Sequence, residues 1–117
     1  MRDHSKLRSY QLADDLVLEV YARTREFPPE ERFGLTSQMR RAALSVVSNL
    51  VEGSARRSET EYARFVELAF GSARELQYQI SLATRLGYLE GGALQSAATQ
   101  VAKSTGALLN ALRGAER

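Results

Sequence analysis

The sequence predicts an all-α protein with a single domain over residues 1–117, an antiparallel, up-down-up-down four-helix bundle. Apolar residues recur at intervals of three and four, whereas no segment alternates with the period of two that a β-strand requires. Four amphipathic segments joined by loops of about four to twelve residues are typical of this topology. A length of 117 residues suits one domain with one core.

The first helix is expected over about residues 6–25. The residues expected on its core-facing side are Tyr10, Ala13, Val17, Val20, Tyr21 and Thr24. Pro28 disfavours helical geometry in Phe27, the residue before it, and has no amide hydrogen to donate. The first helix should therefore end before this point.

The second helix is expected over about residues 36–53. Thr36 or Ser37 can accept a hydrogen bond from a free amide of its first turn, and Gly53 suits the left-handed conformation that commonly ends a helix. The residues expected on its core-facing side are Leu35, Met39, Ala42, Ala43, Val46, Leu50 and Gly53.

The third and fourth helices are expected over about residues 58–86 and 92–113. Ser58 and Glu61 have the spacing of a capping box, in which the serine hydroxyl accepts a bond from the Glu61 amide and the Glu61 carboxylate accepts one from the Ser58 amide. The core-facing residues of the third helix would be Tyr62, Phe65, Val66, Ala69, Ala73, Leu76, Ile80 and Ala83. Those of the fourth would be Leu94, Ala97, Ala98, Val101, Thr105, Leu108, Leu109 and Leu112.

Further apolar residues lie outside the faces that one bundle would bury. Their angles from the centre of the core-facing stripe are about 100° to 160°. These residues are Leu44, Val47 and Val51 in the second helix and Leu68 and Leu82 in the third. Such residues can simply widen the packing of one bundle, since single surface leucines are common. Contiguous apolar patches mark interfaces more often, so the sequence favours a homo-oligomer that uses these residues.

The residue content argues against an enzyme and against a bound cofactor. The chain has no cysteine, and His4 is its one histidine, so no thiolate nucleophile, zinc finger or serine–histidine dyad can form inside the fold. No glycine-rich nucleotide-binding motif occurs either. We expect no catalytic residue, no cofactor and no metal. A carboxylate-only metal site is the alternative, with candidates Glu52, Glu61, Glu67 and Glu75.

The chain has no pattern typical of export or membrane insertion. Its first residues lack the apolar core of a signal peptide. The longest stretch without a charged side chain, residues 91–102, is far shorter than the roughly 20 apolar residues that span a bilayer. We therefore expect a cytoplasmic protein with no membrane partner.

Two polar residues of the second helix, Asn49 and Glu52, are candidates for a structural role. Asn49 lies at the edge of the core-facing stripe, where a buried amide needs hydrogen-bond partners. Either residue can bond a neighbouring helix or a loop backbone. Ligand binding or acid–base chemistry is the alternative for both residues.

Basic residues are segregated along the chain, although the net charge is only +2. Residues 32–64 hold six arginines against three glutamates. The candidate contact residues are Arg40, Arg41, Arg56, Arg57 and Arg64. The planar guanidinium group contacts phosphate through paired hydrogen bonds, which makes RNA or DNA a possible partner. Salt bridges within or between subunits and plain solvation are the alternatives.

Two runs, RFGLTSQMRRAA at residues 32–43 and SNLVEGS at residues 48–54, resemble the bacterial four-helix-bundle proteins encoded in intervening sequences of 23S ribosomal RNA genes. The resemblance extends over about residues 5–90. It implies a four-helix bundle that assembles as a ring, a pentamer, with no known enzymatic activity. The fold also resembles the accessory variability determinant of diversity-generating retroelements, a basic protein that binds reverse transcriptase and nucleic acid.

Two functions are therefore expected from different classes. The first is a non-enzymatic, homo-oligomeric bundle whose arginines contact RNA or DNA. The second is a structural scaffold that binds another protein, with the arginines in salt bridges between subunits. A fold shared with another protein does not by itself transfer function.

Overall fold

The helices lie within two residues of the predicted segments at each end. The computed structural model describes residues 2–4 and 7–115. Its α-helices are α1 (Arg8–Thr24), α2 (Leu35–Ser54), α3 (Glu59–Arg85) and α4 (Ala93–Ala115), and a short 3-10 helix, η2 (Pro29–Glu31), follows α1. No strand occurs in the described ranges, so the all-α prediction is confirmed. Lys6, where the first helix was predicted to begin, lies outside the described residues.

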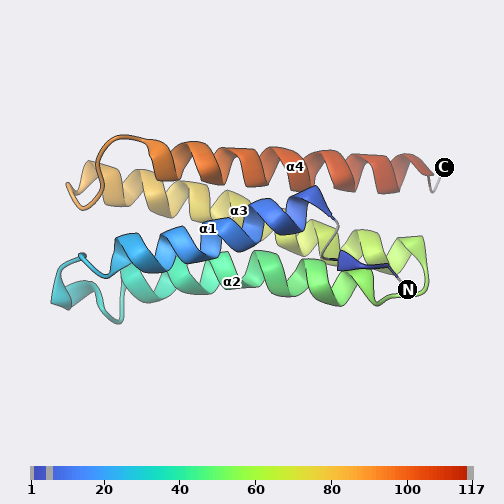
Figure 1. The fold of residues 1–117 in the computed structure, drawn as a ribbon, viewed down its shortest axis with the longest axis horizontal. Coiled ribbons are helices and arrows are strands. Elements are labelled where there is room, and N and C mark those ends of the chain that lie inside the picture. The colour runs from blue at the N-terminus through green and yellow to red at the C-terminus, as the bar shows by residue number, and fades with distance from the viewer. Residues whose placement is uncertain (1, 5–6, 116–117) are drawn as a thin grey trace.

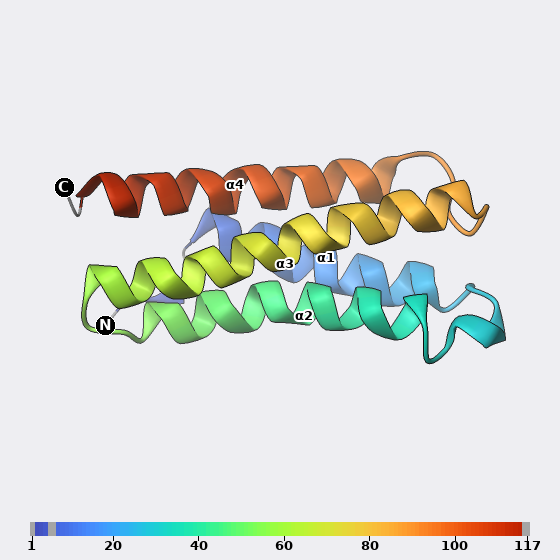
Figure 2. The ribbon, with the colours of Figure 1, turned by 180° about the vertical axis from the view of Figure 1, so that it is seen from behind.

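Helices that follow one another in the chain pack side by side, and α1 also packs on α4. The start of α2 contacts the end of α1, since Arg40 bonds Thr24, whereas Ser54 at the end of α2 bonds Arg2, which precedes α1. The α1–α2 and α3–α4 loops lie at one end of the molecule and the α2–α3 loop lies at the other (Figures 1 and 2). The molecule measures 46 × 20 × 19 Å. One apolar core runs along its length.

The core contains most of the side chains that the helical spacing predicted, but α1 is rotated from its predicted orientation. Leu16, which the predicted stripe omitted, is 2% exposed, whereas Tyr10, Val17 and Tyr21 are only half-buried. The reason is that α1 contacts both α2 and α4, so its most buried residues face between these two helices. The predicted stripe was centred on the side that faces α2.

The start of α2 is capped by Glu31 and not, as predicted, by Thr36 or Ser37. Glu31 Oε1 accepts a hydrogen bond from the Leu35 amide at 3.1 Å, and its other carboxylate oxygen accepts one from the Tyr88 hydroxyl at 2.9 Å. Thr36 is buried inside the helix instead. One carboxylate therefore joins the beginning of α2 to the α3–α4 loop.

Gly53 was predicted to end α2 in the left-handed conformation, and this prediction is wrong. Gly53 instead allows two helices to pack closely. In the described residues, a positive φ occurs at Gly87, Gly91 and Gly92 and not at Gly53. A Cβ atom added to Gly53 would lie 2.8 Å from Cβ of Phe65, so the missing side chain lets α2 approach α3. At the start of α3, the predicted cap forms, since the Ser58 hydroxyl accepts a bond from the Glu61 amide at 3.1 Å.

Two glycine-to-alanine substitutions should have opposite effects on stability. Gly53→Ala should lower the free energy of unfolding by about 1–3 kcal/mol, because the new methyl group overpacks the α2–α3 contact. Gly71→Ala should raise it by about 0.5–1 kcal/mol, because Gly71 is inside α3 with no atom within 4 Å of an added Cβ. Urea unfolding followed by circular dichroism measures both. Equal effects of the two substitutions would contradict this assignment of Gly53.

Candidate nucleic-acid interface

The five predicted contact arginines lie toward opposite ends of the bundle. Arg40 and Arg41 are in the second turn of α2, whereas Arg56 and Arg57 follow that helix and Arg64 is in the second turn of α3. A rise of 1.5 Å per residue places about 20 Å between Arg41 and Ser54, the last residue of α2, and Arg57 follows that end. The structure therefore divides the predicted site into two clusters and does not bring all five residues together.

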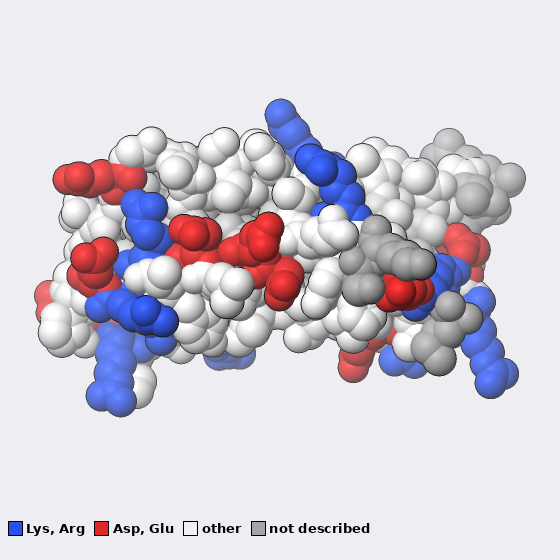
Figure 3. All heavy atoms as spheres, in the orientation of Figure 1, with Lys and Arg blue, Asp and Glu red and all other residues white. Residues whose placement is uncertain are grey.

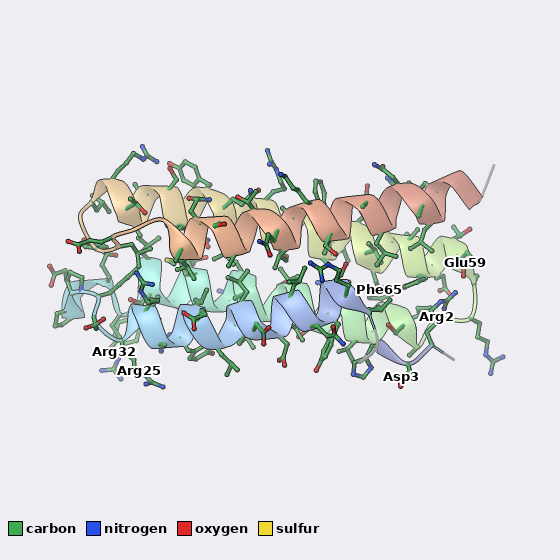
Figure 4. All side chains as sticks on the ribbon, turned by 45° about the horizontal axis from the view of Figure 1, so that its top comes forward. Arg2, Asp3, Arg25, Arg32, Glu59 and Phe65 are labelled. Carbon is green, nitrogen blue, oxygen red and sulfur yellow. The ribbon has the colours of Figure 1, made fainter. Side chains whose placement is uncertain are left out.

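The first group, which we call the α1–α2 cluster, is Arg25, Arg32, Arg40 and Arg41. Arg25 and Arg32 lie beside one another at the end that carries the α1–α2 loop (Figure 4). Arg25, Arg32 and Arg41 are exposed. Arg32, Arg40 and Arg41 line one groove with a volume of about 330 Å³, together with Tyr21 and Phe33.

Arg40 is held inside this cluster by contacts with α1. Its Nε donates to Oγ1 of Thr24 at 2.9 Å, and its guanidinium carbon lies 4.5 Å from the centre of the Tyr21 ring. A second guanidinium nitrogen reaches the carbonyl oxygen of Tyr21 at 3.4 Å. Arg40 is half-buried and its guanidinium group contacts α1 of the same chain, whereas Arg41 is exposed.

The second group, which we call the α2–α3 cluster, is Arg2, Arg56, Arg57 and Arg64. Arg2 pairs with Glu59 and donates to the Arg56 carbonyl oxygen at 2.9 Å. Arg2, Ala55, Arg56 and Arg57 line a cavity of about 580 Å³. The cluster is at the opposite end from Arg25 and Arg32, as the labelled Arg2 and Glu59 show (Figure 4).

Arg56 is stacked within the second cluster. Its guanidinium carbon lies 4.7 Å from the centre of the Phe65 ring, and its Nε is buried without a hydrogen-bond partner among the described residues. Arg2 lies over the Tyr62 ring at 4.2 Å. Burial raises the pKa of the Tyr62 phenol, and the charge of Arg2 opposes this shift. Arg57 and Arg64 are exposed.

Exposed carboxylates separate the two clusters along α1. The acidic residues Asp14, Asp15 and Glu19 are exposed in the middle of this helix. Figure 3 shows a group of acidic side chains in the middle of this face, while both ends carry basic and acidic side chains and further basic side chains rise from the upper middle. Ion pairs within the described ranges join Arg2 to Glu59 and Arg113 to Glu67. Arg40, Arg41, Arg56, Arg57 and Arg64 are in none of these pairs.

The predicted structural residues of α2 lie in different environments. Asn49 is half-buried, and its amide nitrogen donates to the carbonyl and hydroxyl oxygens of Ser45 at 2.8 and 3.1 Å. The Ser45 hydroxyl lies 2.8 Å from that of Ser72, so the bonded chain reaches α3. Glu52 is exposed.

The predicted interface residues lie on α2 and α3 and differ in exposure. Leu44 is 43% exposed and lines the groove with Tyr21, whereas Leu68 on α3 is 57% exposed. Val47, Val51 and Leu82 are half-buried. Arg40, on the Leu44 side of α2, contacts α1, and Ser45, on the other side, contacts α3. Leu44 therefore lies on the α1 side of α2, whereas Leu68 lies on α3.

Two other features bear on cofactors and membranes. Within the described residues, no three potential metal ligands are close enough to hold one ion, so the four candidate glutamates are not gathered into a site. No described helix has the length and apolar content needed to cross a membrane.

Comparison with known proteins decides the family. A family model described as 23S rRNA-intervening sequence protein matches residues 5–111. The chain belongs to this family. This family member is similar in structure to a crystallised protein of unknown function from the S23 ribosomal protein family of Bacteroides thetaiotaomicron. The TM-score is 0.71 at 17% sequence identity, and the match covers 87% of this chain and 98% of the other, which shows a shared fold alone. No curated protein matches the chain.

Adjacent arginines of α2 should differ in their effect on stability. Arg40→Ala should lower the free energy of unfolding by about 1–2 kcal/mol, because it removes the bond to Thr24 and the contact with the Tyr21 ring. Arg41→Ala should change it by less than about 0.5 kcal/mol, because Arg41 is exposed. Thermal unfolding of both variants provides the measurement. A loss for Arg41→Ala as large as that for Arg40→Ala would refute the assignment.

Proposed function

We propose that this protein is a non-enzymatic, antiparallel, up-down-up-down four-helix bundle that assembles with copies of itself and contacts RNA or DNA through its arginine clusters. The observation that carries the proposal is that Arg41, Arg57 and Arg64 are accessible to a partner. All three are exposed, and no carboxylate of the described residues pairs with them. Their guanidinium groups are therefore available to phosphate.

The order of contacts along each neighbouring pair of helices supports the antiparallel topology. On α2 and α3, Ser45 contacts Ser72, whereas Gly53 lies against Phe65. Residue numbers thus rise along α2 as they fall along α3. The contacts between the other neighbouring helices follow the same rule, namely Gln77 with Thr99, Glu67 with Arg113, Arg23 with Glu90 and Ser9 with Ser104.

The non-enzymatic assignment rests on residue content. Hydrolytic and redox sites need a nucleophile, a base and groups that stabilise developing charge at one place. The sequence contains no cysteine, and its single histidine, His4, is in the N-terminal segment. The family resemblance points the same way, because it implies no known enzymatic activity.

Self-assembly is supported by two exposed leucines. Leu44 on one side of α2 and Leu68 on α3 are large, exposed and apolar. A contact between two unlike surfaces of neighbouring copies is heterologous, and its repetition gives a ring where the rotation between copies closes and an open filament where it does not. The resemblance stated for residues 32–54 implies that the ring is a pentamer.

Nucleic acid is supported as the partner by residue type. Arginine is favoured at phosphate because its planar fork forms two parallel hydrogen bonds. The resemblance to the accessory variability determinant of retroelements also points to RNA or DNA. A ring would repeat both clusters in every subunit, so weak contacts would add through multivalency.

A structural scaffold that binds another protein is the second candidate function. The exposed carboxylates Asp14, Asp15 and Glu19 favour it, because they can pair with exposed arginines of a neighbouring copy. In that case the arginines would determine assembly. Arg41→Glu would then change the mass of the assembly more than it changes retention of RNA.

Binding to nucleic acid should depend strongly on salt. If Arg41, Arg57 and Arg64 contact phosphates, affinity for duplex should fall about 40-fold between about 50 and 200 mM salt. Fluorescence anisotropy with a labelled RNA hairpin and a DNA duplex measures this. Substitution of all three by glutamine should remove most of the salt dependence, whereas Arg85→Gln, an exposed arginine outside both clusters, should leave it intact. Absence of binding at about 50 mM salt would defeat the proposal.

Assembly should depend on Leu44 and Leu68. Leu44→Glu and Leu68→Glu should each lower the mass measured by light scattering at micromolar concentration, because each places a charge in an interface that excludes water. Gln100→Glu on α4 is the control, since Gln100 is already polar and exposed. A single-chain mass for the unmodified protein would exclude self-assembly.

A further inference from the structure

We propose that the groove beside Phe33 binds an unpaired nucleotide, with its base stacked on the Phe33 ring and its phosphate held by Arg32 and Arg41. This inference rests on the proposed contact with nucleic acid and specifies its substrate class as single-stranded RNA or DNA. It concerns the α1–α2 cluster alone.

Phe33 is the most exposed large apolar side chain in the described part of the chain, at 85%. The next most exposed, Leu18, is at 66%. Burial of an exposed aromatic ring is favourable, so a flat apolar partner that covers the ring gains binding affinity. The guanidinium carbon of Arg32 lies 5.3 Å from the ring centre. The positive charge of Arg32 thus lies over one face of a ring that is otherwise largely exposed.

The loop that carries Phe33 is anchored on both sides. Glu31, two residues earlier, bonds the Leu35 amide and the Tyr88 hydroxyl. Phe27 is 6% exposed and packs on Tyr88 with ring centres 5.2 Å apart. The exposed ring therefore belongs to a loop whose neighbours are fixed by side-chain bonds. A site held in place before binding loses less entropy when a ligand arrives.

The groove next to Phe33 has the chemistry of a nucleotide site. Its volume is about 330 Å³, its lining includes three arginines and Leu44, and no carboxylate lines it. Leu44 lies about 14 Å along α2 from Leu35 at the start of the helix, so a copy can cover Leu44 and leave the Phe33 end of the groove open. Arg32 and Arg41 are exposed and available to a phosphate, whereas Arg40 is fixed against Tyr21. The Ser37 side chain also lines the groove and is half-buried, so its hydroxyl can bond a base edge or a sugar.

The aromatic face selects an unpaired base over a duplex. Bases in a duplex are stacked on their neighbours and cannot place a free face on a side chain, whereas single strands stack readily on exposed rings. Every base has such a face, so the site should accept several sequences. An acidic peptide with an apolar residue would match the charge of the groove, and the experiment separates this occupant from a nucleotide.

The test compares the full chain with Phe33→Ala on two probes, a labelled oligouridine of about ten nucleotides and an RNA duplex of the same length. Stacking predicts that the substitution weakens single-strand binding by at least about fivefold and leaves duplex binding within about twofold. Tyr78→Ala is the matched control. Tyr78 is 62% exposed and also faces an arginine, Arg85 at 5.7 Å, but is on α3 outside the cluster. It should change neither affinity.

Two further substitutions separate stacking from simple apolar contact. Phe33→Tyr should keep the single-strand affinity because it retains the ring, and Phe33→Leu should lose it because leucine has no aromatic face. Thermal unfolding should stay the same for all three variants, since the side chain is exposed.

Several results would overturn the inference. One is full affinity in Phe33→Leu, and another is displacement of oligouridine by an acidic peptide at equal concentration. A lower assembly mass for Phe33→Ala would place Phe33 at a subunit contact instead. If RNA binding is salt-dependent but unaffected by Phe33→Ala, this inference fails and the proposed function stands. If neither probe binds at low salt, both fail.

Discussion

The α1–α2 end of the bundle depends on two hydrogen bonds that the Glu31 carboxylate accepts. Its two oxygens accept bonds from the Leu35 amide and the Tyr88 hydroxyl, which are 53 residues apart in the sequence. Gly34 leaves space for it, because an added Cβ would lie 2.8 Å from Oε1 of Glu31. The hydrogen bond that the Tyr88 hydroxyl donates to this carboxylate raises the pKa of Tyr88. The bond therefore contributes fully to stability below the unfolded-state pKa of about 10, and this contribution is lost as the pH rises through the higher pKa of the folded state.

In each pair of consecutive arginines, one side chain packs against the fold and the other is exposed. The first member of each pair, Arg40 or Arg56, is half-buried and stacks on a ring of a neighbouring helix, at 4.5 and 4.7 Å. The second member, Arg41 or Arg57, is exposed. On a helix, consecutive side chains differ in direction by about 100°, so Arg40 and Arg41 of α2 supply one inward and one outward group. Arg56 and Arg57 lie in the loop between α2 and α3, where this helical rule does not apply. Charge counted along the sequence therefore overstates the number of arginines available to a partner.

Local patterns in the sequence predicted the helices and one cap, whereas contacts between distant residues were missed. The Ser58 cap was predictable because its partner, Glu61, is three residues away. The Glu31 cap was not, because Tyr88, which holds the carboxylate, is 57 residues away. The orientation of α1 was missed for a related reason, since spacing identifies an apolar face but not which two helices will cover it. The division of the arginines into two clusters also depends on packing, because helix length separates residues that a charge count groups together.

The distribution of charge along the bundle restricts how a polyanion can approach one chain. On the face that α1 presents, the exposed carboxylates of this helix lie between the two ends, so a duplex lying along that face would cross a repulsive stretch. The ends avoid this penalty. If copies formed the proposed ring with their long axes parallel to its symmetry axis, like ends of neighbouring chains would lie side by side, and the arginines would repeat around each rim. The net charge of +2 is then a poor guide, because the potential that a strand meets is that of the rim.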